Sequence, residues 1–253
     1  MNPVIVRNVA IGEGRPKICV PIVGKTADEI IMEARSLRSV PVDVVEWRSD
    51  WFEDVFDAEK LSDTAEALRK TLGDLPVLFT FRTAEEGGEK AVSDRQYEAI
   101  NRAAAQSGCV DLMDVEICTR DEVAGSIITA AHNCNIRVIG SNHDFHRTPP
   151  KEEIIKRLSK MQQSGADILK IALMPQSKQD VLTVLAATLE MSEQHTDRPL
   201  ITMSMAGTGV ISRLAGEVFG SAITFGAASK TSAPGQIGVR QLADVLDIIH
   251  NNL

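Results

Sequence analysis

Short β-rich segments alternate with helix-length amphipathic segments along almost the whole chain of 253 residues. Eight segments rich in branched and aromatic residues recur at 17–23, 42–48, 76–82, 110–117, 136–143, 167–173, 199–205 and 222–227. Between them, apolar residues lie three and four positions apart, as in TADEIIMEARSL and KEEIIKRLSKMQQSG. Strands that alternate with helices predict right-handed βαβ units and a parallel sheet.

Eight such units in about 250 residues match the size of a closed α/β barrel, the (β/α)8 TIM barrel. An open doubly wound sheet is the alternative, but the segment VGKTADE after the first strand lacks the GxGxxG turn of that fold. Residues 1–16 predict an N-terminal β-hairpin that turns at Gly12-Glu13-Gly14 and closes the bottom of the barrel. No linker divides the chain, so we expect a single (β/α)8 barrel domain over residues 1–253.

Charge and composition narrow the classes of partner. The net charge is −8 and the sequence pI about 5.2, which argues against nucleic acid and anionic membranes as partners. The first residues lack the apolar core of a signal peptide, and no apolar run approaches about 18 residues. The cysteines lack metal-type spacing, so we expect a cytoplasmic protein with reduced and mostly buried thiols at Cys19, Cys109, Cys118 and Cys134.

Polar residues gather on one face of the predicted strands, near their carboxyl ends. Side chains alternate between the faces of a strand, so residues two positions apart share a face. In a barrel, one of these faces points toward the axis, and barrel enzymes place their chemistry at the carboxyl ends. A network of buried ion pairs is the alternative, but such pairs stabilise a fold weakly. The interior pairs are Glu46 with Arg48, Thr80 with Arg82, Asp114 with Glu116, Ser141 with His143, and Met203 with Met205.

Lys170 lies in the middle of the apolar segment DILKIALMP (167–175), where a buried charge needs a reason. If this segment is a strand, Leu169 and Ile171 face the helices and Lys170 points into the barrel. A desolvated amine close to other cations can form a Schiff base with a ketone. The alternative is a solvated lysine at the edge of a helix.

The segment SNHDFHRTP (141–149) contains two histidines. His143 ends a predicted strand, and an imidazole can remove and return a proton near neutral pH. His146 follows in a loop, where we expect it to bond to backbone. A metal site is conceivable here, but no HExxH motif or acidic ligand set accompanies the histidines. The segment therefore predicts a general acid/base at His143.

Further candidates follow the third strand and the seventh. Glu85 or Glu86 can orient a catalytic histidine, and a solvated acidic loop is the alternative. Arg213 can clamp a carboxylate with two hydrogen bonds, or it can pair with Glu217 one helical turn on.

Small, flexible and polar residues fill the segment 226–242 before the final helix. Residues 228–237 predict a loop that covers the barrel mouth. Ser232 and Gln236 lie near the start of the last helix, where backbone amides favour an anion, and a phosphate site is the rival use of this region.

The ordered set of motifs resembles the type I 3-dehydroquinate dehydratases, a Schiff-base family of the shikimate pathway to aromatic amino acids. The resemblance covers nearly the whole chain, and no single motif decides it. The matching segments are EWRSD (46–50), LFTFRTAEEGG (78–88), SNHDFH (141–146), KIALMPQS (170–177), ITMSMAGTGVISRLAGEVFGSAITFG (201–226) and SAPGQI (232–237).

The resemblance implies a role for each matching residue. Lys170 matches the lysine that forms an imine with the C3 ketone of 3-dehydroquinate, His143 matches the base, and Glu86 matches the carboxylate partner of that base. Pro21 departs from the pattern, because some relatives offer a serine to the substrate there. Positions that match substrate-contacting or pocket-lining residues are Glu46, Arg48, Arg82, Met203, Met205, Arg213, Ser232 and Gln236.

The resemblance also implies a lyase that needs no metal and no organic cofactor, because the imine itself supplies the electron sink. Relatives are commonly homodimers, so we expect a second copy of the chain as partner beside the small carboxylate substrate. The nearest rival is a class I aldolase or transaldolase that cleaves a sugar phosphate. A catalytically dead barrel that only binds metabolites is a further alternative, which the presence of both Lys170 and His143 disfavours.

Overall fold

Parallel strands form a closed barrel in the computed structural model, which describes residues 1–228 and 235–253. One curled sheet holds nine strands in the order β11-β10-β3-β4-β5-β6-β7-β8-β9, with each neighbouring pair parallel. The barrel strands are β3 (Lys17–Ile22), β4 (Val44–Arg48), β5 (Val77–Thr80), β6 (Leu112–Glu116), β7 (Arg137–Asp144), β8 (Ile168–Leu173), β9 (Leu200–Ser204) and β10 (Ile223–Ala227). Each lies within one of the eight predicted segments, except that β7 extends one residue past its segment, to Asp144.

The sheet closes between β9 and β10. A parallel bridge joins Leu200 to Ser221, and the Ala222 amide donates to the Leu200 carbonyl over 2.7 Å. The short strand β11 (Ile237–Gly238) adds to β10 at Gly226, which the sequence did not reveal. The prediction of a (β/α)8 barrel is confirmed, and the open doubly wound sheet is excluded.

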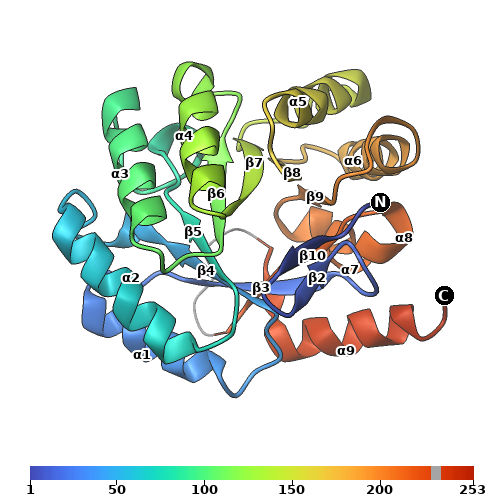
Figure 1. The fold of residues 1–253 in the computed structure, drawn as a ribbon. Helices are drawn as coiled ribbons and strands as arrows, with labels where there is room; N and C mark the ends of the chain where they lie inside the picture. Colours follow the sequence, from blue (N-terminus) through green and yellow to red (C-terminus); the bar gives the residue numbers. More distant parts are fainter. Residues whose placement is uncertain (229–234) are drawn as a thin grey trace.

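Helices cover the outer surface of the sheet (Figure 1). Several begin where the sequence offers a capping side chain, and Ser93 and Ser177 each form a reciprocal capping box. The helices are α1 (Ala27–Leu37), α2 (Ala58–Leu72), α3 (Asp94–Gln106), α4 (Asp121–Asn133), α5 (Lys151–Gln163), α6 (Lys178–Glu190), α7 (Val210–Leu214), α8 (Gly216–Phe219) and α9 (Val239–His250). Short turns of 3₁₀-helix at Ser49–Trp51, Ala84–Glu86 and Gly207–Gly209 follow β4, β5 and β9, and a π-turn at Met191–His195 extends α6.

The two faces of each strand divide the apolar side chains into two layers, as the period of two predicts. Residues of one parity pack between the sheet and the helices, among them Trp47 and Phe79, whose rings meet edge to face at 5.5 Å. Residues of the other parity fill the bottom of the barrel interior, namely Cys19, Val44, Leu78, Leu112, Ile139, Ile168, Ile201 and Ile223. Because apolar residues fill the lower interior, the polar residues of the same parity lie above it.

The N-terminal hairpin, β1 (Val4–Val6) and β2 (Val9–Ile11), closes the bottom of the barrel as predicted. Val6 and Ile11 are buried against the lower interior layer. The predicted position of its turn is wrong, because the chain turns at Arg7 and Asn8. Arg7 has φ of 53°, and a positive φ at the first position of a two-residue turn suits the twist of paired strands. Residues 12–14 instead lead the chain into β3.

All four cysteines are free thiols, as predicted. The expectation that most are buried is wrong. Only Cys19 is buried, Cys109 and Cys118 are half-buried, and Cys134 is exposed at the end of α4. In the described part of the chain, no helix is both long and apolar enough to cross a membrane.

Candidate active site

A single cavity at the carboxyl ends of the barrel strands collects ten of the eleven site residues predicted from the sequence. They come from β4, β7, β8 and β9 and from the segments that follow β5, β9 and β10. The eleventh, Ser232, lies outside the described residues, as does most of the predicted covering loop 228–237. The ten residues in the lining are Glu46, Arg48, Arg82, Glu86, His143, Lys170, Met203, Met205, Arg213 and Gln236.

Lys170 lies on β8 and is only 3% exposed. Its Nζ donates to Asp114 Oδ2 over 2.9 Å and lies 3.9 Å from Glu46 Oε1. The Phe225 ring covers it from the β10 side, with 4.7 Å between Nζ and the ring centroid. The strand prediction for this segment is confirmed, so the amine is a buried group held in one direction.

Asp114 on β6 contacts the lysine directly, although it is not among the site residues predicted from the sequence. The sequence does contain a sign of such a role, because Asp114 shares a face with Glu116 near the end of a strand. Its Oδ1 accepts hydrogen bonds from Arg82 Nη2 over 2.7 Å and from Ser141. Burial raises the pKa of Asp114, but Arg82, Lys170, His143 and the hydrogen bond from Ser141 together lower it to well below the ordinary range. Asp114 is therefore a fixed negative charge beside the amine.

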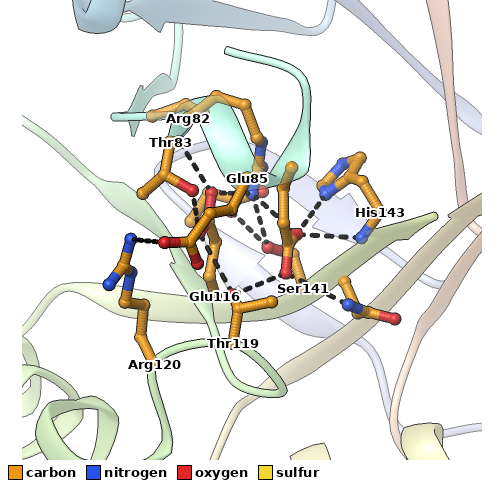
Figure 2. Close-up of polar contacts among 12 residues, drawn as sticks. Arg82, Thr83, Glu85, Glu116, Thr119, Arg120, Ser141 and His143 are labelled. Atoms are coloured by element: carbon orange, nitrogen blue, oxygen red, sulfur yellow. Dashed lines mark hydrogen bonds and ion pairs between the residues drawn. The ribbon is translucent and has the colours of Figure 1, made fainter. Parts of the chain in front are cut away.

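Arg82 follows β5 and lies at the centre of the carboxylates (Figure 2). Its Nη1 donates to Glu116 over 2.9 Å and lies 3.4 Å from Glu86, while Nη2 donates to Asp114. Burial lowers the pKa of Arg82, but these three carboxylates, led by Asp114, raise it well above the ordinary value. One guanidinium thus joins the carboxylate that contacts Lys170 to the carboxylate that contacts His143.

Glu86 orients His143 from the turn that follows β5. Its Oε2 accepts from the backbone N–H of His143 over 2.8 Å and lies 2.9 Å from His143 Nδ1. The predicted acidic partner of the histidine is therefore Glu86, because the Glu85 side chain is more than half exposed and pairs with Arg120. This geometry leaves Nε2 of the imidazole as the ring nitrogen available for chemistry.

The His143 imidazole is held in its neutral form. Burial lowers its pKa well below the ordinary value, and the positive charges of Arg82 and Lys170 lower it further. His146 lies in the loop beyond β7, as expected, but the expected bond from its ring to backbone is not among the contacts of the described residues. Its backbone amide instead donates to the Asp144 side chain over 3.1 Å. A neutral imidazole in a charged cavity suits a base that acts near neutral pH.

Arg48 lines the cavity from β4 and is held by Asp50. Its Nε and Nη2 donate to the two carboxylate oxygens of Asp50, each over 2.8 Å. Asp50 also accepts from the backbone amide of Glu89, which ties β4 to the loop after β5. Glu46, two residues before Arg48, accepts from the Thr80 hydroxyl over 2.9 Å. This side of the cavity is therefore built from satisfied, fixed charges.

The opposite side, from β9 and α7, is largely apolar. Met203 and Met205 are buried there, and Arg213 Nη1 lies 3.6 Å from the Met203 sulphur. Burial lowers the pKa of Arg213 to about 10. The alternative pairing of Arg213 with Glu217 is not found among the described residues. The Glu217 carboxylate instead contacts His250 Nδ1 at 2.6 Å.

Pro21 lies on β3 in register with Glu46 and is not among the described residues that line the cavity. Its ring offers no hydroxyl at this position. Within residues 1–228 and 235–253, no group of three or more His, Cys, Asp or Glu side chains is arranged to hold a metal ion.

Comparisons with known proteins point to one family. The profile of the type I 3-dehydroquinases matches residues 18–253. The 3-dehydroquinate dehydratase of Salmonella agona is 56% identical over 250 residues, which cover 99% of each chain. A solved type I 3-dehydroquinate dehydratase from Clostridium difficile, with covalently modified comenic acid, superposes with a TM-score of 0.96 at 51% identity over 99% of each chain. The solved 3-dehydroquinate dehydratase of Enterococcus faecalis superposes with a TM-score of 0.91 at 43% identity, over 97% of this chain and 99% of its own.

Proposed function

The chain belongs to the type I 3-dehydroquinase family, and from this premise we propose that Lys170, His143 and Glu86 carry its reaction. The enzyme is a lyase that converts 3-dehydroquinate to 3-dehydroshikimate and water, a step of the shikimate pathway. The observation that carries the assignment of residues is the meeting of a buried amine and a neutral imidazole in one cavity.

Lys170 acts first, as the nucleophile. The amine loses one proton and adds to the C3 carbonyl of the substrate. This proton and a second one from the nitrogen leave with the carbonyl oxygen as water, which gives a protonated imine. The imine withdraws electrons from C2, so the C2 proton becomes easier to remove. The Clostridium difficile relative carries covalently modified comenic acid, which supports covalent chemistry in this kind of site.

His143 then acts as base and acid in turn. Nε2 removes the C2 proton, and the electron pair of that bond forms an enamine with the imine carbon. The same imidazole returns the proton to the C1 hydroxyl, which leaves as water while the enamine reverts to an imine. Water finally hydrolyses this imine and frees Lys170 and the conjugated ketone. The net change is the loss of one water from the substrate.

Asp114 supports these steps as the fixed counter-charge of the nitrogen. Its carboxylate lies 2.9 Å from Nζ and remains ionised, because Arg82 and Lys170 lower its pKa strongly. A negative charge at this distance stabilises the cationic imine. We assign no proton transfer to Asp114, since a carboxylate with so low a pKa is a poor proton acceptor.

Arginines and polar groups around the cavity hold the substrate. We assign Arg213 and Gln236 to the substrate carboxylate and Arg48 and Glu46 to its hydroxyl groups, because all four line the cavity. We assign Ser232 to the same set from its motif alone. Met203 and Met205 exclude water from the imine.

The same proposal covers partners and place of action. Because the protonated imine supplies the electron sink, the enzyme needs neither a metal nor an organic cofactor. We propose that it works as a homodimer in the cytoplasm, without nucleic acid or membrane partners. Light scattering of the purified protein tests the dimer, and a monomeric mass would contradict it.

Turnover of 3-dehydroquinate by purified protein tests the residue assignment. The parent should produce the ultraviolet absorbance of the conjugated product, and Lys170→Met should lose roughly 10⁴-fold or more of this rate. An active Lys170→Met variant would contradict the assignment of the nucleophile. Cleavage of sugar phosphates without turnover of 3-dehydroquinate would favour the aldolase alternative.

A further inference from the structure

We propose that Asn142 and Arg157 form a positioning pair that fixes the proton of His143 on Nδ1 by holding Glu86 as a carboxylate. The inference rests on the proposed role of His143 as the base. Asn142 is the third residue from the end of β7 and is 5% exposed, and Arg157 lies on α5.

A chain of hydrogen bonds runs from the helix to the imidazole. Arg157 Nη1 donates to Asn142 Oδ1 over 3.0 Å. Asn142 Nδ2 donates to Glu86 Oε1 over 3.0 Å, and Glu86 Oε2 lies 2.9 Å from His143 Nδ1. Arg157 is itself fixed by carboxylates, with Nε 3.2 Å from Glu153 and Nη1 3.5 Å from Asp144.

The direction of this chain follows from the chemistry of its first member. A guanidinium has donors only, so the Asn142 atom that faces Arg157 must be the carbonyl oxygen. The amide nitrogen of Asn142 then faces Glu86 and can only donate. Arg157 thereby decides which end of the Asn142 amide meets the catalytic carboxylate.

Glu86 is surrounded by donors at both oxygens. Oε1 accepts from Asn142 and from the Thr119 hydroxyl, the latter over 2.7 Å, and Oε2 accepts from the backbone amide of His143. These donors bind more strongly to a carboxylate than to a protonated carboxyl group, so they favour the carboxylate. The contact to His143 Nδ1 must then come from an N–H on the ring, which leaves the lone pair on Nε2.

The donors around Glu86 act against the net shift of its pKa. Burial and then Glu116 raise the pKa of Glu86 to about 8, although Arg82, Thr119 and Asn142 lower it. Loss of the Asn142 donor therefore makes it easier for a proton to bind to the pair formed by Glu86 and His143. The charged and titratable groups that face this pair from the surrounding elements are Arg48 on β4, Arg82 after β5, Asp114 and Glu116 on β6, Cys118 after β6, Arg157 on α5 and Lys170 on β8.

Arg157 and Asn142 are reached from a cavity other than the active site. This second cavity, of about 520 Å³, lies behind His143 and Phe145 and is lined by both members of the pair. Neither Arg157 nor Asn142 lines the substrate cavity. Substitutions of these residues therefore alter the hydrogen bonds that lead to His143 without changing the lining of that cavity.

The test is the pH dependence of kcat/KM for Asn142→Leu, with borohydride trapping of the imine as a second readout. We expect the acidic limb of the profile to move upward by about one pH unit, because the dyad takes up its proton more readily. At acidic pH, on the rising limb of the profile, kcat/KM should fall about tenfold. On the pH-independent plateau it should fall much less. Trapping on Lys170 should persist, and nitrogen NMR of the parent should place the ring proton of neutral His143 on Nδ1.

Arg157→Gln is the second variant, should Asn142→Leu fail to fold. It frees the Asn142 amide to rotate, so we expect a smaller shift in the same direction. Glu153→Gln is the matched control, because it removes an ionic partner of Arg157 but leaves the contact between Arg157 and Asn142. In this variant the acidic limb of the pH profile should stay where it is in the parent.

An equal loss of kcat/KM at every pH would overturn the positioning role. So would an acidic limb that lies at the same pH in both variants as in the parent. Loss of trapping in the variants would also overturn it, because the effect would then extend to Lys170. Absence of trapping in the parent is a separate result that contradicts the proposed function itself.

Discussion

Two buried arginines lie in the cavity under opposite conditions. Arg82, on the side of β5 and β6, contacts three carboxylates, which raise its pKa. Arg213, on the side of β9 and α7, lies against the Met203 sulphur, and burial lowers its pKa to about 10. The exposed fractions are 4% for Arg82 and 2% for Arg213, so exposure does not explain the difference.

The difference separates two uses of one side chain. Carboxylates of the protein neutralise the charge of Arg82. Its hydrogen bonds hold Glu86 and Asp114 in place and are therefore not available to a substrate. The charge of Arg213 is disfavoured by burial, so a substrate carboxylate that arrives beside it gains more. We therefore regard the β5–β6 side as the part that organises the proton chemistry and the β9 side as the part that binds the substrate.

The largest effect should come from the base that the carboxylate side orients. His143→Ala removes the imidazole but leaves Lys170, so dehydration should fall by roughly 10²–10⁴-fold. Some imine should still be trapped by borohydride in this variant. Full dehydratase activity in His143→Ala would remove His143 from its role and break the division between the two sides.

The next effect should be on stability and should come from Arg82. Arg82→Met leaves Asp114, Glu86 and Glu116 buried without their shared counter-charge. We expect the free energy of unfolding to fall by about 3–5 kcal/mol, as when one partner of a buried ion pair is removed. Urea denaturation measures it, and a variant as stable as the parent would show that the three carboxylates do not depend on Arg82.

Arg213 should change binding rather than stability. Arg213→Gln removes a charged contact to the substrate carboxylate, worth about 1.5–3 kcal/mol, so KM should rise roughly 10–100-fold. The free energy of unfolding should change less than in Arg82→Met. Steady-state kinetics alongside urea denaturation gives both values, and a large loss of stability with unchanged KM would reverse the comparison.

The smallest effect should come from the first strand. Pro21→Ser restores the hydroxyl that some relatives offer to the substrate, beside Glu46 in the register of the sheet. One neutral hydrogen bond should lower KM by no more than about two- to tenfold. A higher KM would mean that the hydroxyl is not directed to the substrate in this barrel.

Much of this arrangement follows from the sequence because a strand has a fixed period. The period of two placed Lys170, His143 and Arg82 on the interior face, and the structure confirms this for each. The closed barrel followed from the number and spacing of the strands. These features depend on local patterns, which a single sequence contains in full.

Features that depend on pairing across the barrel did not follow. Asp114 was assigned to the correct face, but its contact with Lys170 depends on the stagger of β6 against β8, which no local pattern records. Asn142 and Arg157 meet only because α5 packs back on β7. The hairpin turn was misplaced because two glycines favour a turn, whereas the chain uses a positive φ at Arg7, uncommon outside glycine.

The central claim is that Lys170 forms a covalent imine with the substrate. Borohydride reduction in the presence of 3-dehydroquinate converts such an imine to a stable secondary amine, which peptide mass mapping locates. We predict one added substrate on the peptide that contains Lys170. An unchanged protein mass, or an adduct on a different lysine, would contradict the account.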